Sequence, residues 1–255
     1  MSRYPRLAKL VAKVFGYTHV GNFARSLAFR RALARLPLDQ IQRVLDLGCG
    51  FGEYAVLMAR RLPQAQVTGL ELHQRKTDLL REIAAREGLT NLSPHLGTID
   101  TLPEEARFDL IYSVDVFEHI LEPEMPFALA HARLEPGGYL LVKMPSRTQR
   151  IIAPESWFGD HQVWLDEEHI GQVYELDDLE ARFEWEGFEV VYAAYSDGWL
   201  ARLGWELNYF GNRLGAAVQL ALLPLAKLLV RLDHLQGGRR KGNAIQVIGR
   251  KAIRN

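Results

Sequence analysis

A glycine-rich segment with one acidic residue is the part of the sequence whose residue types and spacing point most directly to chemistry. It reads Asp46-Leu47-Gly48-Cys49-Gly50-Phe51-Gly52 and joins an apolar run to a stretch of helix-forming residues. Glycines there allow positive φ angles and remove side chains, so the backbone can approach a ligand closely at the start of a helix. The segment therefore predicts a binding site for a nucleotide-type ligand.

Glu71 strengthens this prediction because it ends the next apolar run, 66–70, where a carboxylate can accept hydrogen bonds from two ribose hydroxyls. The dinucleotide pattern G-x-G-x-x-G would place a third glycine or alanine at Glu53, whereas Gly52 comes one residue earlier. The acidic Asp46 also suits a ligand with an amino group and a cationic sulfur better than one with a pyrophosphate. The residues favour such a ligand over NAD.

The elements that must position these residues alternate between strand and helix patterns from about residue 42, which is typical of a parallel sheet wrapped by helices. Predicted strands cover 44–47, 66–70, 92–98, 108–114, 139–144, 188–194 and 243–250. Predicted helices cover 53–62, 74–87, 123–134, 175–186, 199–213 and 214–235. Pro136-Gly137-Gly138 is expected to turn the chain into the fifth strand.

These elements predict an α/β fold with a doubly wound, seven-stranded and mostly parallel sheet, a helical N-terminal segment and a helical insertion before the last strand. The expected parts are an N-terminal helical cap (1–41), a cofactor-binding α/β core (42–195), a helical insertion that acts as a lid or faces a membrane (196–242), and the last core strand with a basic tail (243–255).

Five motifs resemble the successive motifs of class I S-adenosylmethionine-dependent methyltransferases: DLGCGFG, Glu71, Asp100, FDLIYSVDVFEHI and LEPGGYLLVKMPS. The resemblance covers about residues 42–195 plus the last strand. It implies that the last strand is antiparallel and that the cofactor is S-adenosyl-L-methionine. Around the fourth strand the sequence is similar to O-methyltransferases of ubiquinone synthesis, which act on small molecules.

The resemblance also implies which residues hold the cofactor. Asp46, Gly48 and Gly50 would surround the methionine part, Glu71 would bind the ribose, Asp100 would lie near the adenine amino group, Leu72 and Ile99 would flank the adenine ring, and Asp115 would lie beside the methionine end. A turn-capping role is the alternative for Asp100.

Methyl transfer from a sulfonium is an in-line displacement, so much of its acceleration can come from alignment of donor and acceptor. His119, with Glu118, is expected at the mouth of the active site, where it would act as a base for a hydroxyl acceptor. A packing or capping role is the alternative for this pair. A divalent-metal face of Asp115, Glu118 and His119 on one helix is a further hypothesis, although we expect Asp115 to serve the cofactor and assign no metal.

The segment 146–174 shows no regular pattern, and a loop of this length in a compact domain is more often functional than idle. Trp157, Phe158, His161 and Trp164 are the predicted wall of the acceptor site. Aromatic side chains at such a place can cover an apolar substrate and exclude water. The alternative is that the rings fasten the loop to the domain.

The formal net charge of zero is unevenly distributed. Residues 1–43 hold nine Lys or Arg and one acidic residue, residues 44–213 hold fourteen and twenty-nine, and residues 214–255 hold eight and one. Basic termini beside the apolar stretch 214–230 suit contact with an anionic membrane or a lid over a lipid-like acceptor. Helices that pack on each other as a cap over the substrate cleft are the alternative.

The remaining features narrow the class of protein. The single cysteine, Cys49, cannot form an internal disulfide, and the first residues show no secretory signal, so we expect a cytoplasmic protein. Nucleic acid is not favoured as a partner because no nucleic-acid-binding motif accompanies the basic tracts. The leading hypothesis is a methyltransferase acting on a small-molecule or lipid-linked acceptor. A nucleotide-dependent oxidoreductase and a non-catalytic, membrane-associated cofactor-binding module are the alternatives.

Overall fold

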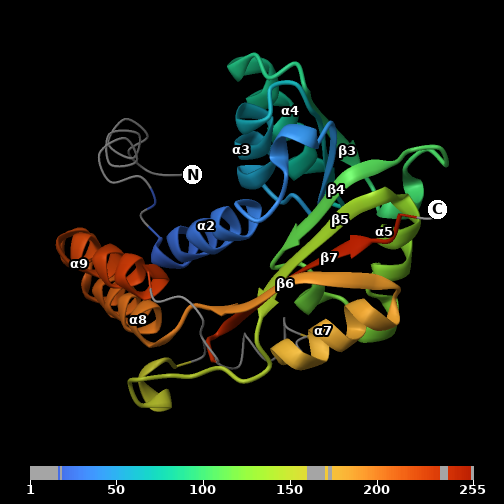
Figure 1. The fold of residues 1–255 in the computed structure, drawn as a ribbon. Coiled ribbons are helices and arrows are strands. Elements are labelled where there is room, and N and C mark those ends of the chain that lie inside the picture. Colours follow the sequence, from blue (N-terminus) through green and yellow to red (C-terminus); the bar gives the residue numbers. More distant parts are fainter. Residues whose placement is uncertain (1–16, 18, 160–169, 172–173, 236–240, 254–255) are drawn as a thin grey trace.

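A seven-stranded sheet forms the centre of the molecule, with strand order β3-β2-β1-β4-β5-β7-β6 and helices on both faces (Figure 1). The computed structural model describes residue 17 and residues 19–159, 170–171, 174–235 and 241–253. β7 is antiparallel to β5 and β6, and the pairings among β1 to β5 are parallel. The predicted doubly wound fold with an antiparallel last strand is confirmed.

The elements have the following bounds. The strands are β1 (Arg43–Leu47), β2 (Gln66–Glu71), β3 (Leu92–Leu96), β4 (Phe108–Val114), β5 (Leu134–Pro145), β6 (Phe188–Ser196) and β7 (Ala244–Lys251). The α-helices are α2 (Val20–Leu33), α3 (Glu53–Arg61), α4 (Gln74–Glu87), α5 (Phe127–Arg133), α7 (Leu176–Trp185), α8 (Trp199–Leu214) and α9 (Ala216–Leu235). Short 3-10 turns are η1 (Leu38–Gln40), η2 (Ile99–Thr101), η3 (Phe117–His119), η4 (Glu122–Glu124) and η5 (Glu155–Trp157).

Two hydrophobic cores hold the helices to the sheet, one on each face. On one face, apolar residues of α2, α3 and α4 pack with Val44 and Leu110. On the other face, Phe127 of α5 and Phe183 of α7 pack with Ile111. Consecutive residues of one strand, such as Leu110 and Ile111 of β4, therefore enter opposite cores, because successive side chains of a strand point to opposite faces of the sheet.

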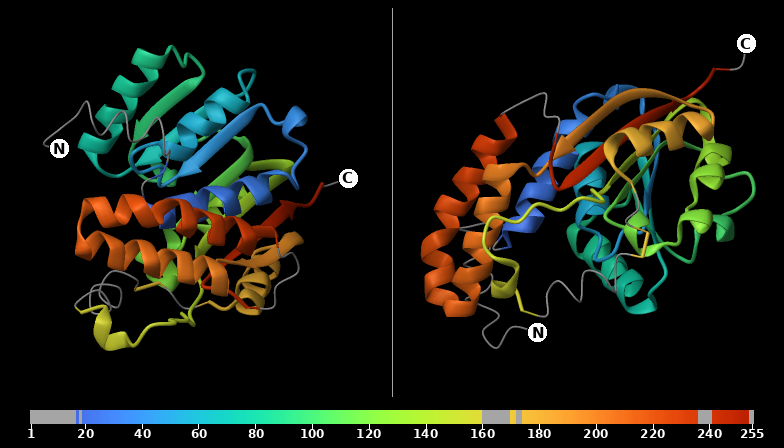
Figure 2. Two further views of the ribbon diagram at one scale, coloured as in Figure 1. Left: turned by 90° about the vertical axis from the view of Figure 1, so that its left-hand side faces the viewer. Right: turned by 90° about the horizontal axis from the view of Figure 1, so that it is seen from below.

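A third cluster joins the N-terminal helix to the insertion. The helices α8 and α9 pack side by side as a hairpin beside α2 (Figure 2). Val20 and Phe23 of α2 contact a patch that includes Leu223, Ala226 and Val230 of α9. The N-terminal helix α2 and the insertion, α8 and α9, therefore form one unit beside the carboxyl end of β6. Within the described residues, no helix is long and apolar enough to cross a membrane.

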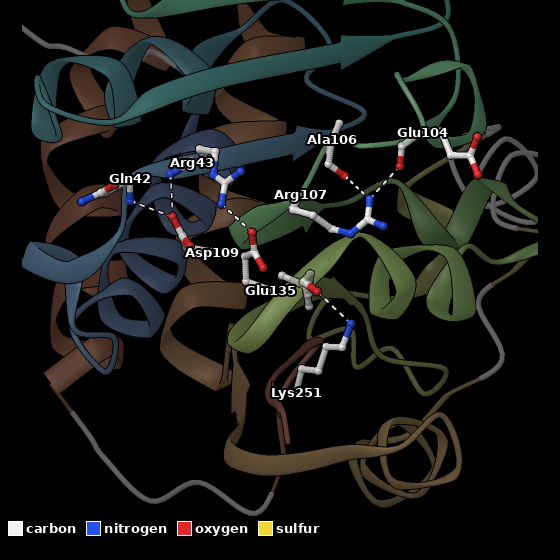
Figure 3. Close-up of polar contacts among 9 residues, drawn as sticks. Gln42, Arg43, Glu104, Ala106, Arg107, Asp109, Glu135 and Lys251 are labelled. Carbon is white, nitrogen blue, oxygen red and sulfur yellow. Dashed lines mark hydrogen bonds and ion pairs between the residues drawn. The ribbon is translucent and has the colours of Figure 1, made fainter. Parts of the chain in front are cut away.

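Polar contacts fix the amino ends of the strands, at the edge opposite the glycine segment (Figure 3). Asp109 accepts hydrogen bonds from the backbone N–H groups of Gln42 and Arg43, and the Arg43 guanidinium pairs with Glu135. Lys251 donates to the carbonyl oxygen of Leu134 at 2.7 Å. These contacts keep β1, β4 and β5 in register, so that their carboxyl ends meet at one edge.

The prediction of one continuous helix over residues 123–134 is wrong. The chain forms η4, leaves the helical conformation at Met125 and begins α5 at Phe127. Pro126 explains the break, because a proline disfavours the α conformation of the residue before it and has no N–H to continue a helix.

Other boundaries also differ from the predictions. β5 begins at Leu134, so Pro136-Gly137-Gly138 lies within the strand at a register irregularity and is not a separate turn. Gly215, with φ of 120°, separates α8 from α9, which therefore begins two residues later than predicted. β3 ends at Leu96 because Gly97, with φ of 142°, turns the chain away.

Candidate active site

The glycine segment forms a tight turn between β1 and α3. Gly48, Gly50 and Gly52 have φ angles of 80°, 56° and 82°, which L side chains rarely adopt. The N–H groups of Gly48 and Cys49 both donate to the carbonyl oxygen of Leu70 on β2, at 3.0 and 2.8 Å. A Cβ atom added at Gly50 would meet no atom within 4 Å, so the space above this part of the turn is open to a ligand.

Glu71 connects the end of β2 to this turn. Its Oε2 accepts a hydrogen bond from the N–H of Gly50 at 2.9 Å, and its Oε1 accepts one from the N–H of His73 at 3.0 Å. The Lys76 ammonium lies 3.7 Å from Oε1. Each carboxylate oxygen keeps acceptor capacity for a further donor, because an ionised carboxylate offers about four lone-pair sites.

The residues predicted for the adenine differ in exposure. Leu72 follows Glu71 and leaves 66% of its surface exposed, whereas Ile99, the first residue of η2, is buried in the core. Asp100 is exposed, and its carboxylate accepts a hydrogen bond from the Thr98 hydroxyl. This hydrogen bond lowers the pKa of Asp100 and matches the turn-capping alternative.

Asp46 lies beneath the turn and not in its opening. It belongs to β1, opposite Tyr112 of β4, and is only 2% exposed. Burial raises the pKa of its carboxyl group from the usual range to about 8. Asp46 is therefore enclosed between β1 and β4, and a direct contact with the methionine part stays a prediction.

Asp115 follows β4 and adopts a φ angle of 52°. Its Oδ1 accepts a hydrogen bond from the Lys143 ammonium at 2.7 Å, and the Arg25 guanidinium lies 2.6 Å from its Oδ2. Its backbone N–H also donates to the carbonyl oxygen of Lys143 at 2.8 Å. Arg25 belongs to α2, so this carboxylate ties the N-terminal helix to the carboxyl ends of β4 and β5.

Glu118 and His119 are neighbours with different surroundings. Glu118 is 1% exposed, and burial together with the nearby Asp115 carboxylate raises its pKa well above its usual value. His119 is exposed at the surface. Of this pair, the exposed His119 is the side chain that a hydroxyl acceptor can reach, whereas the Glu118 carboxyl group is enclosed.

The hypothesis of a metal face is wrong for the part of the chain that the structure describes. Asp115 precedes a 3-10 turn of three residues, Phe117–His119, so the i, i+3 and i+4 relationship of an α-helix does not exist here. Among the described residues no group of three His, Cys, Asp or Glu side chains could hold a metal ion. Asp115 faces Lys143 and Arg25 instead.

Two of the four residues predicted for the acceptor wall are described, and His161 and Trp164 lie outside the described residues. Phe158 is buried against α8, where its ring packs on Trp205, Tyr209 and Phe210. Trp157 is 58% exposed and meets the edge of the Phe210 ring. The long loop and the insertion are therefore joined by aromatic rings, which agrees with the fastening alternative for Phe158.

Sequence reasoning missed three charged residues at this end of the sheet: Arg25, Lys143 and Asp197. Lys143 had the clearest signal, because it is a charged residue inside an otherwise apolar strand, and it is 3% exposed. Asp197 follows β6 and has a φ angle of 56°. Arg25 gave no signal, since nothing in an N-terminal helix shows which arginine turns towards the sheet.

One cavity lies on the outer side of the glycine turn. It has a volume of about 580 Å³ and is lined by Phe51 and Gly52 of the turn and by residues of α3 and α4 such as Arg60 and Arg86. None of the residues predicted to hold the cofactor or the acceptor lines it. We assign it no role.

Comparison with known proteins identifies the relatives of this chain. Residues 20–193 match the methyltransferase-domain family. Trans-aconitate 2-methyltransferase of Variovorax paradoxus is 33% identical over 140 residues, which cover 52% of this chain and 52% of that protein. (S)-Coclaurine N-methyltransferase of Papaver somniferum is 30% identical over 111 residues, covering 44% of this chain and 32% of that protein. The chain thus matches about half the length or less of these relatives.

Solved structures share the fold at low sequence identity. An O-methyltransferase from a polyketide synthase of Brevibacillus brevis, in complex with S-adenosyl-L-homocysteine, aligns with a TM-score of 0.58 and 14% identity over 89% of this chain and 72% of that chain. Phosphoethanolamine N-methyltransferase 2 of Haemonchus contortus, in complex with S-adenosyl-L-methionine, aligns with a TM-score of 0.56 and 20% identity over 83% and 49%. The [4+2]-cyclase SpnF aligns equally well, with a TM-score of 0.60, so this likeness establishes the fold alone.

Proposed function

This chain belongs to the methyltransferase-domain family, within the class I S-adenosylmethionine-dependent methyltransferases, and we propose that it transfers a methyl group from S-adenosyl-L-methionine to a small-molecule acceptor. The observation that carries this proposal is the contact of Glu71 with Gly50, because it places a carboxylate and an open glycine turn in one site. The direct test is calorimetric titration of the chain with S-adenosyl-L-methionine, with NAD as the competing ligand.

The residues around the turn fit the cofactor chemically. The free space at Gly50 accommodates a ligand against the backbone, and Glu71 has oxygen lone pairs for the two ribose hydroxyls. The exposed Leu72 provides an apolar surface for one face of the adenine ring, beside the buried Ile99. When bound, the cofactor supplies an electrophilic methyl group on a sulfonium.

The methionine end of the cofactor is assigned to Gly48 and to Asp115, and Asp100 is assigned to the adenine amino group. Asp115 is suited to this place because Lys143 and Arg25 hold its two carboxylate oxygens in position, so that it can face the cofactor's ammonium group without moving. The capping contact with Thr98 leaves Asp100 further lone pairs for an amino group.

The acceptor is expected to approach over the carboxyl ends of β4 and β5, next to the position proposed for the methyl group of the bound cofactor. Acceleration then comes largely from alignment of acceptor and donor in a site that excludes water. For a hydroxyl acceptor we assign the proton to His119, which is exposed at this edge, and we give Glu118 a positioning role because it is buried.

The aromatic side chains Trp157 and Phe158 are proposed to line or support the acceptor site, together with His161 and Trp164 of the same loop. Phe158 is proposed to support the acceptor site because its ring packs on α8, and Trp157 is proposed to line it because its ring is exposed. The insertion thereby becomes part of the element that selects the acceptor.

A finer proposal concerns a peripheral contact with an anionic membrane and a lipid-like acceptor. The outer face of α9 carries an exposed apolar stripe, Val218, Leu225, Leu228, Leu232 and Leu235, at alternating helical spacings. The basic residues Lys227 and Arg231 lie on the same helix, and the one acidic residue of α9, Asp233, is buried. An amphipathic helix with this composition suits the headgroup region of an anionic membrane.

A further inference from the structure

A group of charged side chains lies between α2 and the carboxyl ends of β4, β5 and β6. It consists of Arg25, Asp115, Glu118, Lys143 and Asp197, and we refer to it as the charged cluster. Asp115 pairs directly with Lys143 and Arg25. Glu118 and Asp197 are within electrostatic reach of the same two cations, which lower the pKa of both carboxyl groups against the effect of burial.

Within the described residues, carboxyl groups outnumber cations around this cluster. Both cations, Arg25 and Lys143, contact Asp115. Asp233 of α9 adds a fourth carboxyl group, which accepts a hydrogen bond from the N–H of Gly198 at 3.0 Å and acts electrostatically on Asp197. His19 adds no positive charge at neutral pH, because burial and the Arg25 guanidinium lower its pKa.

Both aspartates of the cluster have a strained backbone. Among the described residues, Asp115 and Asp197 are the two non-glycine residues with positive φ, at 52° and 56°. Such conformations are strained and persist where the surrounding structure holds them, most often at functional sites. Their occurrence at the carboxyl ends of β4 and β6 marks this edge of the sheet as a site.

Deeply buried acceptor atoms at this end of the sheet lack hydrogen-bond donors in the described structure. Glu118 is 1% exposed, and its Oε2 has no partner. Ser196, which precedes Asp197, is 4% exposed, and its Oγ has none either. Buried polar atoms of this kind are normally satisfied in folded proteins. A ligand that brings N–H donors would supply the missing partners.

From this geometry we infer that the charged cluster binds the methyl acceptor through an amine. The inference rests on the proposed methyl transfer. Because Asp115 is assigned to the cofactor, an ammonium group of the acceptor would bring positive charge and N–H donors to the other two carboxyl groups of the cluster, Glu118 and Asp197.

An anionic acceptor is disfavoured by the same arrangement. A carboxylate would have to compete with Asp115 for Arg25 and Lys143, and it would lie near Glu118 and Asp197. Like charges placed together in a buried site repel each other strongly. This distinguishes the chain from relatives named for trans-aconitate, which is a carboxylic acid.

The transfer balances with groups of this chain. Asp197 accepts a proton from the ammonium group of the acceptor, which leaves a nitrogen lone pair. The nitrogen–carbon bond to the methyl group forms as the carbon–sulfur bond breaks, and that electron pair stays on sulfur. The product is an N-methylated ammonium ion, whose positive charge replaces that of the sulfonium. Asp197 is free to adopt this role because it is not paired with Arg25 or Lys143 in a salt bridge within 4 Å.

The test uses two probes of similar size and opposite charge, 2-phenylethylamine and 3-phenylpropanoate. Each is titrated calorimetrically into the full chain saturated with S-adenosyl-L-homocysteine. We expect the amine to bind at least about tenfold more tightly than the carboxylate, and Asp197→Asn to lower amine affinity about tenfold. Asparagine tolerates the positive φ of this position, so the variant should fold. Asp39→Asn, in the exposed η1 turn, is the matched control and should bind like the wild type.

Three results would overturn the inference: a carboxylate that binds as tightly as the amine, no amine binding at millimolar concentration, or wild-type amine binding by Asp197→Asn. Before either probe is added, S-adenosyl-L-homocysteine alone is titrated into the chain. This titration separates failure of the inferred acceptor class from failure of the proposed function. If the homocysteine compound binds and the amine does not, only the acceptor class is wrong. If it does not bind, the methyltransferase proposal itself fails.

Discussion

The carboxylate of Glu71 accepts a hydrogen bond from the backbone N–H of Gly50, 2.9 Å away, and so connects the end of β2 to the turn after β1. The contact is charge-assisted, and it is made by a side chain that is nearly buried. It fixes the orientation of the carboxylate relative to the open face of the turn. A cofactor that needs both groups therefore meets them already in place.

Glu71→Ala should lower the affinity for S-adenosyl-L-methionine by about a hundredfold. The variant removes the acceptor for the ribose hydroxyls and also releases the N–H groups of Gly50 and His73. Calorimetry measures the loss. Glu82→Ala, an exposed position on α4, is the control and should bind normally. Wild-type affinity in a folded Glu71→Ala protein would remove Glu71 from the ribose role.

Much of the fold was predictable because its signals are local. The helix 74–87 and the strand 108–114 have the predicted bounds, since Gly88 stops the helix in a left-handed conformation and the strand is a continuous apolar run. The glycine turn and Glu71 were predictable for the same reason, because their chemistry depends on residues adjacent to strand ends.

Contacts between distant segments were not predictable from one sequence. Arg25 meets Asp115 across ninety positions of the chain, and only the packing of α2 on the sheet brings them together. Asp115 was expected to follow the fourth strand and only the metal hypothesis placed it on a helix, whereas the structure has a positive φ and a short 3-10 turn after β4. Local pattern cannot reveal such a bend at a residue other than glycine.

Lys143→Met should destabilise the fold by about 3 kcal/mol, because the largely buried Asp115 carboxylate then loses the buried one of its two cationic partners. Urea unfolding followed by circular dichroism measures the change in the free energy of unfolding. Asp78→Asn is the matched control, since it breaks the exposed pair with Arg81 and should change stability by less than about 0.5 kcal/mol. Equal effects in both variants would show that burial does not strengthen the Lys143 contact.

Asp46 should make the free energy of unfolding decrease as the pH rises. Its pKa is raised from 3.8 to about 8 in the folded protein, chiefly by burial, so in this interval the folded state keeps a proton that the unfolded state releases. Stability from this group is therefore present below about pH 4 and is lost progressively towards pH 8.

Asp46→Asn isolates that effect, because asparagine resembles the protonated acid and does not titrate. Urea unfolding at pH 5 and pH 8 should show a larger loss of stability at pH 8 in the wild type than in the variant. An identical pH dependence of the two proteins would contradict the assignment of a proton to Asp46.

The double variant Leu228→Gln/Leu232→Gln should weaken binding to anionic vesicles. The wild type is expected to sediment with vesicles of phosphatidylserine and phosphatidylcholine at low salt and to be released as the salt concentration rises. Leu129→Gln, which alters an equally exposed leucine on α5, is the control. Absence of wild-type binding at low salt would exclude the membrane contact, and unchanged binding of the double variant would exclude the stripe on α9.

Calorimetric titration of the wild-type chain with S-adenosyl-L-methionine, and separately with NAD, tests the central claim most directly. The account predicts saturable binding of S-adenosyl-L-methionine at micromolar concentration and no binding of NAD in the same range, because the glycine turn and Glu71 fit a nucleoside with a sulfonium side chain. Micromolar binding of NAD with no heat from S-adenosyl-L-methionine would contradict it.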